Sequence, residues 1–216
     1  MSQATIVAFA GRIGAGKSSV AKALADHLGW KLTSFGAYIR TVASSRGLSL
    51  SRESLQAVGE ELEATDATAL CRAVLNAAFW QPGEPLVIEG IRHLRVLEIL
   101  KSLVAPQPLV FVYLEADEEQ RRSRLRDRGT GEAERLDAVE AHPTEQEVFT
   151  HLPKLADLVL SSAGGSESEL ATTVSKPGPV SASFALRFSF AKASRFICSF
   201  ICEYFLNTFE AFSGGS

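Results

Sequence analysis

The feature that most constrains this chain is a glycine-rich string between an apolar run and an amphipathic segment near the N-terminus. Residues 5–10 form the apolar run and predict a short buried strand. Residues 11–18 read Gly-Arg-Ile-Gly-Ala-Gly-Lys-Ser, which is the G-x-x-x-x-G-K-[ST] pattern. Residues 17–28 carry apolar side chains at helical spacing and are followed by Gly29, a common helix C-cap. A strand, this turn and a helix in that order predict a phosphate-binding loop.

The ability of such a loop to bind phosphate comes from its backbone. Glycines let consecutive N–H groups turn toward one centre, and the following helix adds the positive end of its dipole. We expect the following residues to cradle the phosphates of ATP: Gly11, Arg12, Ile13, Gly14, Ala15, Gly16, Lys17, Ser18 and Ser19. Lys17 would contact the β- and γ-phosphates, and the Ser18 hydroxyl would bind Mg²⁺. The alternative interpretation is a glycine-rich turn with a solvated lysine.

Short apolar runs alternate with helical patterns over the rest of the first 176 residues. Further strands are expected at four places: residues 32–35, 86–88, 109–114 and 157–160. This alternation predicts a three-layer α/β fold, in which a five-stranded parallel sheet carries helices on both faces. A capping box, Thr144-x-x-Glu147, is expected to start a late helix. We expect residues 125–143 to form a small lid, because 129–143 show no apolar periodicity.

Composition narrows the class of protein. The 216 residues are 46% apolar and 22% charged, which excludes wholesale disorder. A net charge of −3 argues against a partner that is a nucleic-acid polymer. Three cysteines form no disulfide framework, the N-terminus has no signal-peptide pattern, and no uncharged run reaches about 18 residues. These observations favour a cytoplasmic protein with no transmembrane segment.

Four weaker patterns follow the glycine-rich string along the chain. They are Ser34-Phe35-Gly36 with Arg40, residues 87–92 (Val-Ile-Glu-Gly-Ile-Arg), residues 113–116 (Tyr-Leu-Glu-Ala) with Arg124 and Arg128, and Ala156-Asp157. Through them, about residues 4–175 resemble the nucleoside monophosphate kinase group of P-loop proteins, the relatives of adenylate, cytidylate and dephospho-CoA kinases. The resemblance implies a P-loop kinase-like domain over 1–176. Its expected activity is transfer of the γ-phosphate of Mg-ATP to a small phosphorylated acceptor, a nucleoside or deoxynucleoside monophosphate.

The resemblance also implies roles for individual residues. Arg92 and Arg40 would grip the acceptor phosphate, with Ser34 and Phe35 beside it. Glu89 would bind Mg²⁺ or its waters together with Ser18, or would instead pair with a nearby arginine.

The lid side of the site carries five arginines within eight residues. Arg124 and Arg128 lie four apart on one helical face and match the family's lid arginines, which contact the donor phosphates as Lys17 does. The other three are expected to be solvated or paired with acids: Arg121, Arg122 and Arg126. One departure from the family is Ala37, near which several relatives carry an aspartate.

Two other activities stay open at this stage. Dephospho-CoA is the close alternative acceptor, and its phosphorylated group is a ribose hydroxyl. A P-loop ATPase or regulatory switch that acts on a macromolecular partner is the alternative of another class.

Residues 177–216 differ in composition from the rest of the chain. Eight of the 13 phenylalanines lie between Phe184 and Phe212, and aromatic residues recur at helical spacing. We expect this extension to dock on the kinase-like body or to make a homodimer or partner contact. The alternatives are a membrane surface and a non-native extension that does not pack. A short helix is expected near 166–174, before the extension begins.

Overall fold

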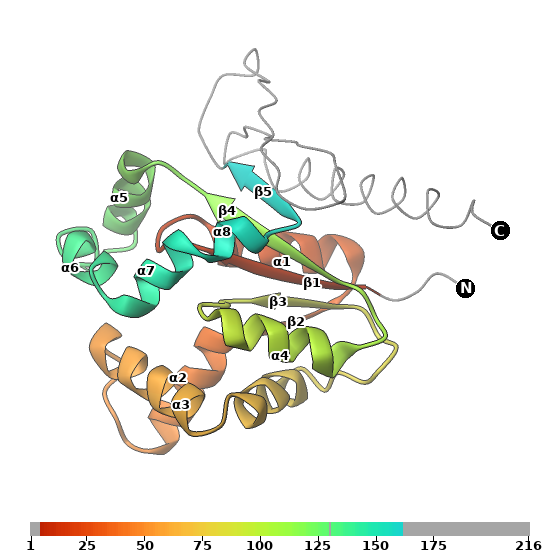
Figure 1. The fold of residues 1–216 in the computed structure, drawn as a ribbon. Coiled ribbons are helices and arrows are strands. Elements are labelled where there is room, and N and C mark those ends of the chain that lie inside the picture. The colour runs from red at the N-terminus through yellow and green to blue at the C-terminus, as the bar shows by residue number, and fades with distance from the viewer. Residues whose placement is uncertain (1–4, 130, 162–216) are drawn as a thin grey trace, which may run out of the picture.

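A computed structural model of the chain describes residues 5–129 and 131–161 (Figure 1). The strands are β1 (Ile6–Gly11), β2 (Lys31–Ser34), β3 (Leu86–Glu89), β4 (Leu109–Glu115) and β5 (Leu158–Ser161). The helices are α1 (Lys17–Leu28), α2 (Phe35–Ser45), α3 (Arg52–Ala77), α4 (Leu94–Val104), α5 (Glu118–Asp127), α6 (Leu136–Glu140), α7 (Pro143–Thr150) and α8 (Leu152–Leu155). The expected helix near 166–174 and the 177–216 extension lie outside the described residues.

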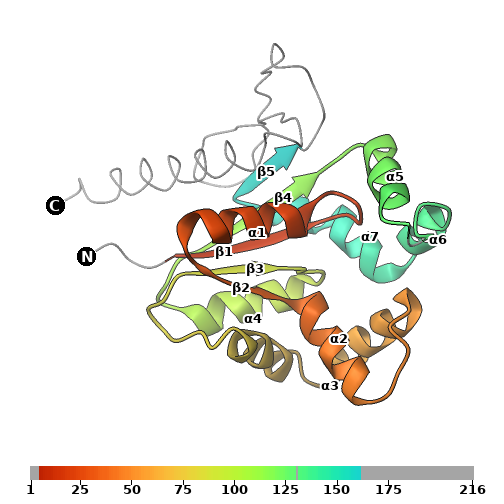
Figure 2. The same cartoon turned by 180° about the vertical axis from the view of Figure 1, so that it is seen from behind.

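The five strands form one parallel sheet in the order β2-β3-β1-β4-β5. Helix α4 lies on one face of this sheet and α1 on the other, as the two opposite views show (Figures 1 and 2). The predicted three-layer α/β fold with a five-stranded parallel sheet is therefore confirmed. None of the helices in the described ranges is long and apolar enough to cross a membrane.

The central strand β1 divides the hydrophobic core in two because its side chains alternate between the faces of the sheet. Ile6 and Ala8 join the cluster under α3, α4 and α8, whereas Val7 and Phe9 join the cluster under α1. All four side chains are completely buried. Burial on both faces explains why this strand is a continuous apolar run. The packed strand also fixes the position of its carboxyl end, where the glycine-rich string begins.

One local prediction is corrected. The capping box is wrong, because α7 starts one residue before Thr144, and the side chain of His142 accepts the N-terminal hydrogen bond. The region 129–143, which shows no apolar periodicity, contains the short helix α6, in which Leu136 is fully buried. A helix of five residues is too short to show a periodic pattern in sequence.

The long helix α3 is bent at Asp66. The φ and ψ angles of this residue are −159° and 90°, and its side chain accepts a hydrogen bond from the backbone N–H of Ala69. The bend separates two stretches with apolar residues at helical spacing, Leu55, Val58 and Leu62 before it and Leu70, Val74 and Ala77 after it. The first half of α3 runs alongside α2, and the second half packs on α4.

Candidate functional site

The glycine-rich loop sits at the carboxyl end of β1, where ligands of parallel sheets bind. Gly14 and Gly16 have φ angles of 76° and 96°. A Cβ atom on Gly14 would lie 2.9 Å from the carbonyl oxygen of Arg121, so glycine is needed there for space as well as for conformation. Helix α1 starts at Lys17 with no side-chain cap among the described residues. Its first-turn N–H groups can therefore bind an anion.

Lys17 lies folded against this loop. Its Nζ donates a hydrogen bond of 2.8 Å to the carbonyl oxygen of Arg12. Burial is the largest cause that lowers the pKa of Lys17 to about 7; the charges of Arg92, Arg52 and Arg128 act in the same direction, while that of Glu89 acts against them. Three arginines from other segments therefore surround the loop lysine, which makes this place favourable for a multiply charged anion.

Glu89 joins two predicted site residues at the end of β3. Ser18 Oγ donates to its Oε2 over 3.1 Å, and Ser34 Oγ donates to its Oε1 over 2.6 Å. Ser34 also caps α2 by accepting a hydrogen bond from the N–H of Ala37. Within the described chain Glu89 hydrogen-bonds these serines and no arginine. A hydroxyl and a carboxylate side by side are oxygen donors of the kind that Mg²⁺ prefers.

The two predicted lid arginines lie near the glycine-rich loop. Arg124 donates from Nη1 to the carbonyl oxygens of Gly14 and Ala15, over 3.3 and 3.1 Å. Arg128 contributes to the wall of a neighbouring cavity and lies near enough to Lys17 to lower its pKa. The structure therefore brings both predicted lid arginines to the glycine-rich loop or its immediate surroundings.

A second pair of arginines is fixed beside the loop by Glu140 at the end of α6. Arg12 donates to both oxygens of Glu140 and stacks over the ring of Phe149, 4.5 Å from its centroid. Arg121 also donates to Glu140, and its side chain is only 1% exposed. Arg121 was expected to be either solvated or paired with an acid. The structure shows it paired with an acid, and its side chain is fully buried.

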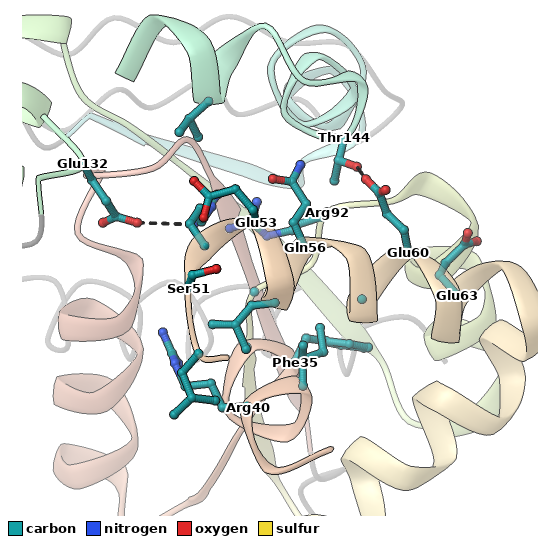
Figure 3. Close-up of a pocket in the computed structure, with 18 of the residues that line it drawn as sticks. Phe35, Arg40, Ser51, Glu53, Gln56, Glu60, Glu63, Arg92, Glu132 and Thr144 are labelled. Atoms are coloured by element: carbon teal, nitrogen blue, oxygen red, sulfur yellow. Dashed lines mark hydrogen bonds and ion pairs between the residues drawn. The ribbon is translucent and has the colours of Figure 1, made fainter. Parts of the chain in front are cut away.

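A cavity of about 540 Å³ opens between α2, α3 and the segment that follows β3 (Figure 3). Its wall includes four predicted site residues: Phe35, Arg40, Arg92 and Arg128. Lid residues 131, 132, 135 and 139 also contribute. The cavity therefore lies between the lid and the α2–α3 pair.

Arg92 is held in this cavity by a residue that sequence reasoning missed. Glu145, on α7, is almost completely buried and accepts hydrogen bonds at Oε1 from Arg92 Nη1 and from Arg52 Nη2, the latter over 2.7 Å. Burial lowers the pKa of Arg92 to about 10, and the neighbouring Arg52 contributes to this shift. Glu132 from the lid lies 3.8 Å from Arg52 Nη1.

Arg52, Gln56 and Glu145 are functional candidates that the sequence did not single out. A weak signal existed for the first two, because Arg52, Gln56 and Glu60 recur every four residues on one face of α3. Nothing in the sequence marks Glu145 as buried. Helix α2 contains no acidic residue, so no carboxylate within it replaces the aspartate that several relatives carry near Ala37. The acidic residues of the cavity wall lie on α3 and on the lid.

Fold and loop together define a P-loop nucleotide-binding protein with a small-kinase architecture. Residues 7–145 match the family described as AAA domain. The UPF0200 protein of Aeropyrum pernix is 32% identical over 165 residues, which cover 75% of this chain and 86% of that protein. The chain belongs to the UPF0200 family of AAA-domain P-loop proteins.

Solved structures support the fold assignment. A provisionally named kinase of Chloroflexus aurantiacus superposes with a TM-score of 0.57 at 18% identity, covering 96% of this chain and 98% of that one. The shikimate kinase of Acinetobacter baumannii, solved with shikimate, gives 0.54 at 18% identity, covering 96% of each chain. TT1252 of Thermus thermophilus gives 0.51 at 22% identity over 76% of this chain and 91% of that one. The fold of this chain is that of the small P-loop kinases.

Proposed function

We propose that this protein is an ATP-dependent phosphotransferase that moves the γ-phosphate of Mg-ATP to a small phosphorylated acceptor. The observation that carries the proposal is the adjacency of two sites. A glycine-rich loop with a half-buried lysine lies next to a separate cavity lined with arginines, and Arg92 in that cavity lowers the pKa of Lys17. Transfer between two phosphorylated molecules requires such a pair of anion sites at one edge of the sheet.

The donor side would hold the triphosphate through the backbone N–H groups of the loop and of the first turn of α1. Lys17 would exchange its hydrogen bond to the carbonyl of Arg12 for contacts with the β- and γ-phosphates. Arg124, already bonded to the loop carbonyls, is placed to add charge there. Each of these groups neutralises charge that moves onto the phosphoryl group during transfer.

Ser18 and Glu89 fit a Mg²⁺ ion by the chemistry of their oxygen atoms. The Ser18 hydroxyl would bind the ion directly, and Glu89 would hold it or its waters, as the hydrogen bond between them suggests. When bound, Mg²⁺ neutralises phosphate charge. Ser34, which shares Glu89, would keep that carboxylate in a fixed orientation.

The transfer itself needs positioning more than covalent help from the protein. An oxygen of the acceptor bonds to the γ-phosphorus while the bond from that phosphorus to its bridging oxygen breaks, and ADP leaves. Arg92 would hold the acceptor phosphate in line with the γ-phosphate. The lid would exclude water, which is a competing acceptor.

We favour a nucleoside or deoxynucleoside monophosphate as the acceptor. A cavity of about 540 Å³ suits a ligand of that size better than the longer dephospho-CoA. Arg40 and Phe35 line it together with Arg92 and would contact the same acceptor.

A coupled ADP-release screen tests the proposal. It covers the ribo- and deoxyribonucleoside monophosphates and dephospho-CoA, with Lys17→Ala as the blank and mass detection of the phosphorylated product. At least one monophosphate should raise ADP formation above the water background. If only dephospho-CoA does so, the acceptor assignment is wrong. If no small acceptor does so, the kinase proposal fails and the ATPase-switch alternative takes its place.

A further inference from the structure

One face of α3 runs the length of the cavity and changes charge from one end to the other. Arg52, Gln56, Glu60 and Glu63 all line the cavity from this helix, and Figure 3 shows Gln56, Glu60 and Glu63 following one another along it. A helix rises 1.5 Å per residue, so Arg52 and Glu63 are separated by about 16 Å along the axis. The cavity therefore has an arginine-rich end near the P-loop, here called the basic end although Glu53 and Glu132 also line it, and an acidic end away from the P-loop.

At the basic end, two guanidinium groups share one carboxylate. Arg52 and Arg92 both donate to the same oxygen of Glu145. Glu132 lies 3.8 Å from Arg52 Nη1 as a second carboxylate at this end. Each guanidinium has five N–H donors, so these contacts leave N–H donors of both groups for a ligand. Both arginines line the cavity, and both lower the pKa of Lys17. Two planar forks that share one carboxylate match a phosphate dianion better than a carboxylate monoanion.

The acidic end offers hydrogen-bond acceptors. Glu60 accepts a hydrogen bond of 2.8 Å from Thr144 Oγ1, and Glu63 lies 3.7 Å from Arg95 Nη1. Between the two ends, the Nε2 atom of Gln56 is buried and has no hydrogen-bond partner among the described residues. A buried donor without a partner costs free energy unless a ligand supplies an acceptor.

We propose that Arg52 binds the acceptor phosphate together with Arg92. Gln56 and Glu63 form hydrogen bonds with groups on the body of the same acceptor. Glu145 is the positioning residue that sets Arg52 beside Arg92. The acceptor is thus a phosphomonoester with N–H or O–H donors at its far end, as the base of a nucleoside monophosphate provides. This inference rests on the proposed function and assigns residues that the family resemblance does not supply.

Calorimetric titration in the presence of saturating Mg²⁺ and AMP-PNP tests the basic end. The probes are AMP, CMP, GMP, UMP and dTMP, each paired with its nucleoside. For a monophosphate that binds the wild type, Arg52→Gln should weaken binding roughly ten- to hundred-fold, and Arg52→Lys should lose less. The nucleoside affinity should stay the same, and the AMP-PNP affinity should fall much less than that of the monophosphate. Arg46→Gln is the control, because Arg46 pairs with Glu61 outside the cavity.

The acidic end is tested with Glu63→Ala. This substitution should weaken the monophosphate and its nucleoside by a similar factor, because it removes an acceptor from the body of the ligand rather than from its phosphate. Glu61→Ala is the matched control, since Glu61 lies two residues away and is absent from the cavity wall. Equal affinity of Glu63→Ala and the wild type for both ligands would remove Glu63 from the proposal.

The outcomes separate this site from the proposed reaction. If Arg52→Gln binds every monophosphate as tightly as the wild type, the basic end is wrong while the kinase proposal stands. If binding depends on Arg52 but the same monophosphate does not stimulate ADP formation, the site stands and the kinase proposal fails. If no monophosphate binds the wild type beside AMP-PNP, the phosphomonoester site is overturned.

Discussion

Two carboxylates five residues apart hold two pairs of arginines, one on each side of the candidate site. Glu140 binds Arg12 and Arg121 beside the glycine-rich loop. Glu145 binds Arg52 and Arg92 in the cavity. In both cases one acid joins cations from elements that are distant in sequence. The same pairing thus appears beside the glycine-rich loop, the proposed donor side, and beside the cavity, the proposed acceptor side.

The two pairs differ in what surrounds them. Arg121 is sealed from solvent and also donates to the carbonyl of Ile13 over 3.4 Å, so this member of the pair belongs to the packed interior, while the side chain of Arg12 is 29% exposed. The side chains of Arg52 and Arg92 are 23% and 33% exposed and line a cavity. The donor-side pair therefore fixes the loop, whereas the acceptor-side pair keeps N–H groups available for a ligand.

The largest effect is expected from Glu140→Gln. Arg121 would keep its charge in a buried place with no carboxylate beside it, so the free energy of unfolding should fall by about 3–5 kcal/mol. Urea unfolding followed by circular dichroism measures this change. Asp137→Asn is the control, because Asp137 lies on the same helix, is 83% exposed and should change stability by less than about 1 kcal/mol. If Glu140→Gln lowers the free energy of unfolding as little as the control does, the contrast between the Glu140 pair and the Glu145 pair is wrong.

Lys17→Ala tests the proposed donor side through the rate of ADP formation rather than through the free energy of unfolding. Acceptor-stimulated ADP formation should fall about 10²–10³-fold, because a preorganised charge at the transferring phosphate is removed. Steady-state rates measure the loss, with unfolding by urea as a check on the fold. Lys22→Ala is the control, since Lys22 pairs with Asp26 on the exposed face of the same helix. A rate for Lys17→Ala near that of the wild type would exclude the loop from catalysis.

Glu145→Gln sharpens the contrast between the two pairs. Its cost in stability should be about 1–2 kcal/mol, smaller than that of Glu140→Gln, because Arg52 and Arg92 retain contact with water. The same urea series measures it. An equal loss in both variants would mean that the acceptor-side pair is as much a part of the interior as the donor-side pair.

Proton uptake on binding AMP-PNP is the smallest effect and reports the electrostatics of Lys17. In the free protein its pKa is about 7, so the side chain is mostly neutral at pH 8. Bound phosphates favour the charged form, and binding should therefore take up most of one proton at pH 8 and almost none at pH 5.5. Calorimetry in buffers of different ionisation enthalpy measures the uptake. Equal uptake at both pH values would contradict the half-buried placement of Lys17 among arginines.

The sequence revealed the donor side better than the acceptor side for a physical reason. The phosphate-binding loop uses consecutive backbone groups, so one short string that contains Gly14, Gly16 and Lys17 is enough to predict it. The alternation of strands and helices likewise gave the parallel sheet, and family resemblance gave Arg92, Glu89 and their neighbourhood. The roles of these residues stay predictions.

The acceptor side depends on contacts that no local pattern encodes. Glu145 becomes buried only because α7 packs across the cavity, and Arg52 reaches it from 93 positions earlier in the chain. Glu147 illustrates the same limit. It was expected to close a capping box with Thr144, but instead it accepts a hydrogen bond from the N–H of Leu94 at the start of α4. Side-chain pairing between distant elements overrode the local motif.

The short link between α6 and α7 has a consequence for exchanging parts among relatives. Only Ala141 and His142 separate the two helices, so adding or deleting one residue there would shift Glu140 relative to Glu145. One arginine pair would then lose its carboxylate. A graft that changes acceptor preference must therefore transplant residues 121–145 as one block, together with recipient positions that match Arg12, Arg52 and Arg92.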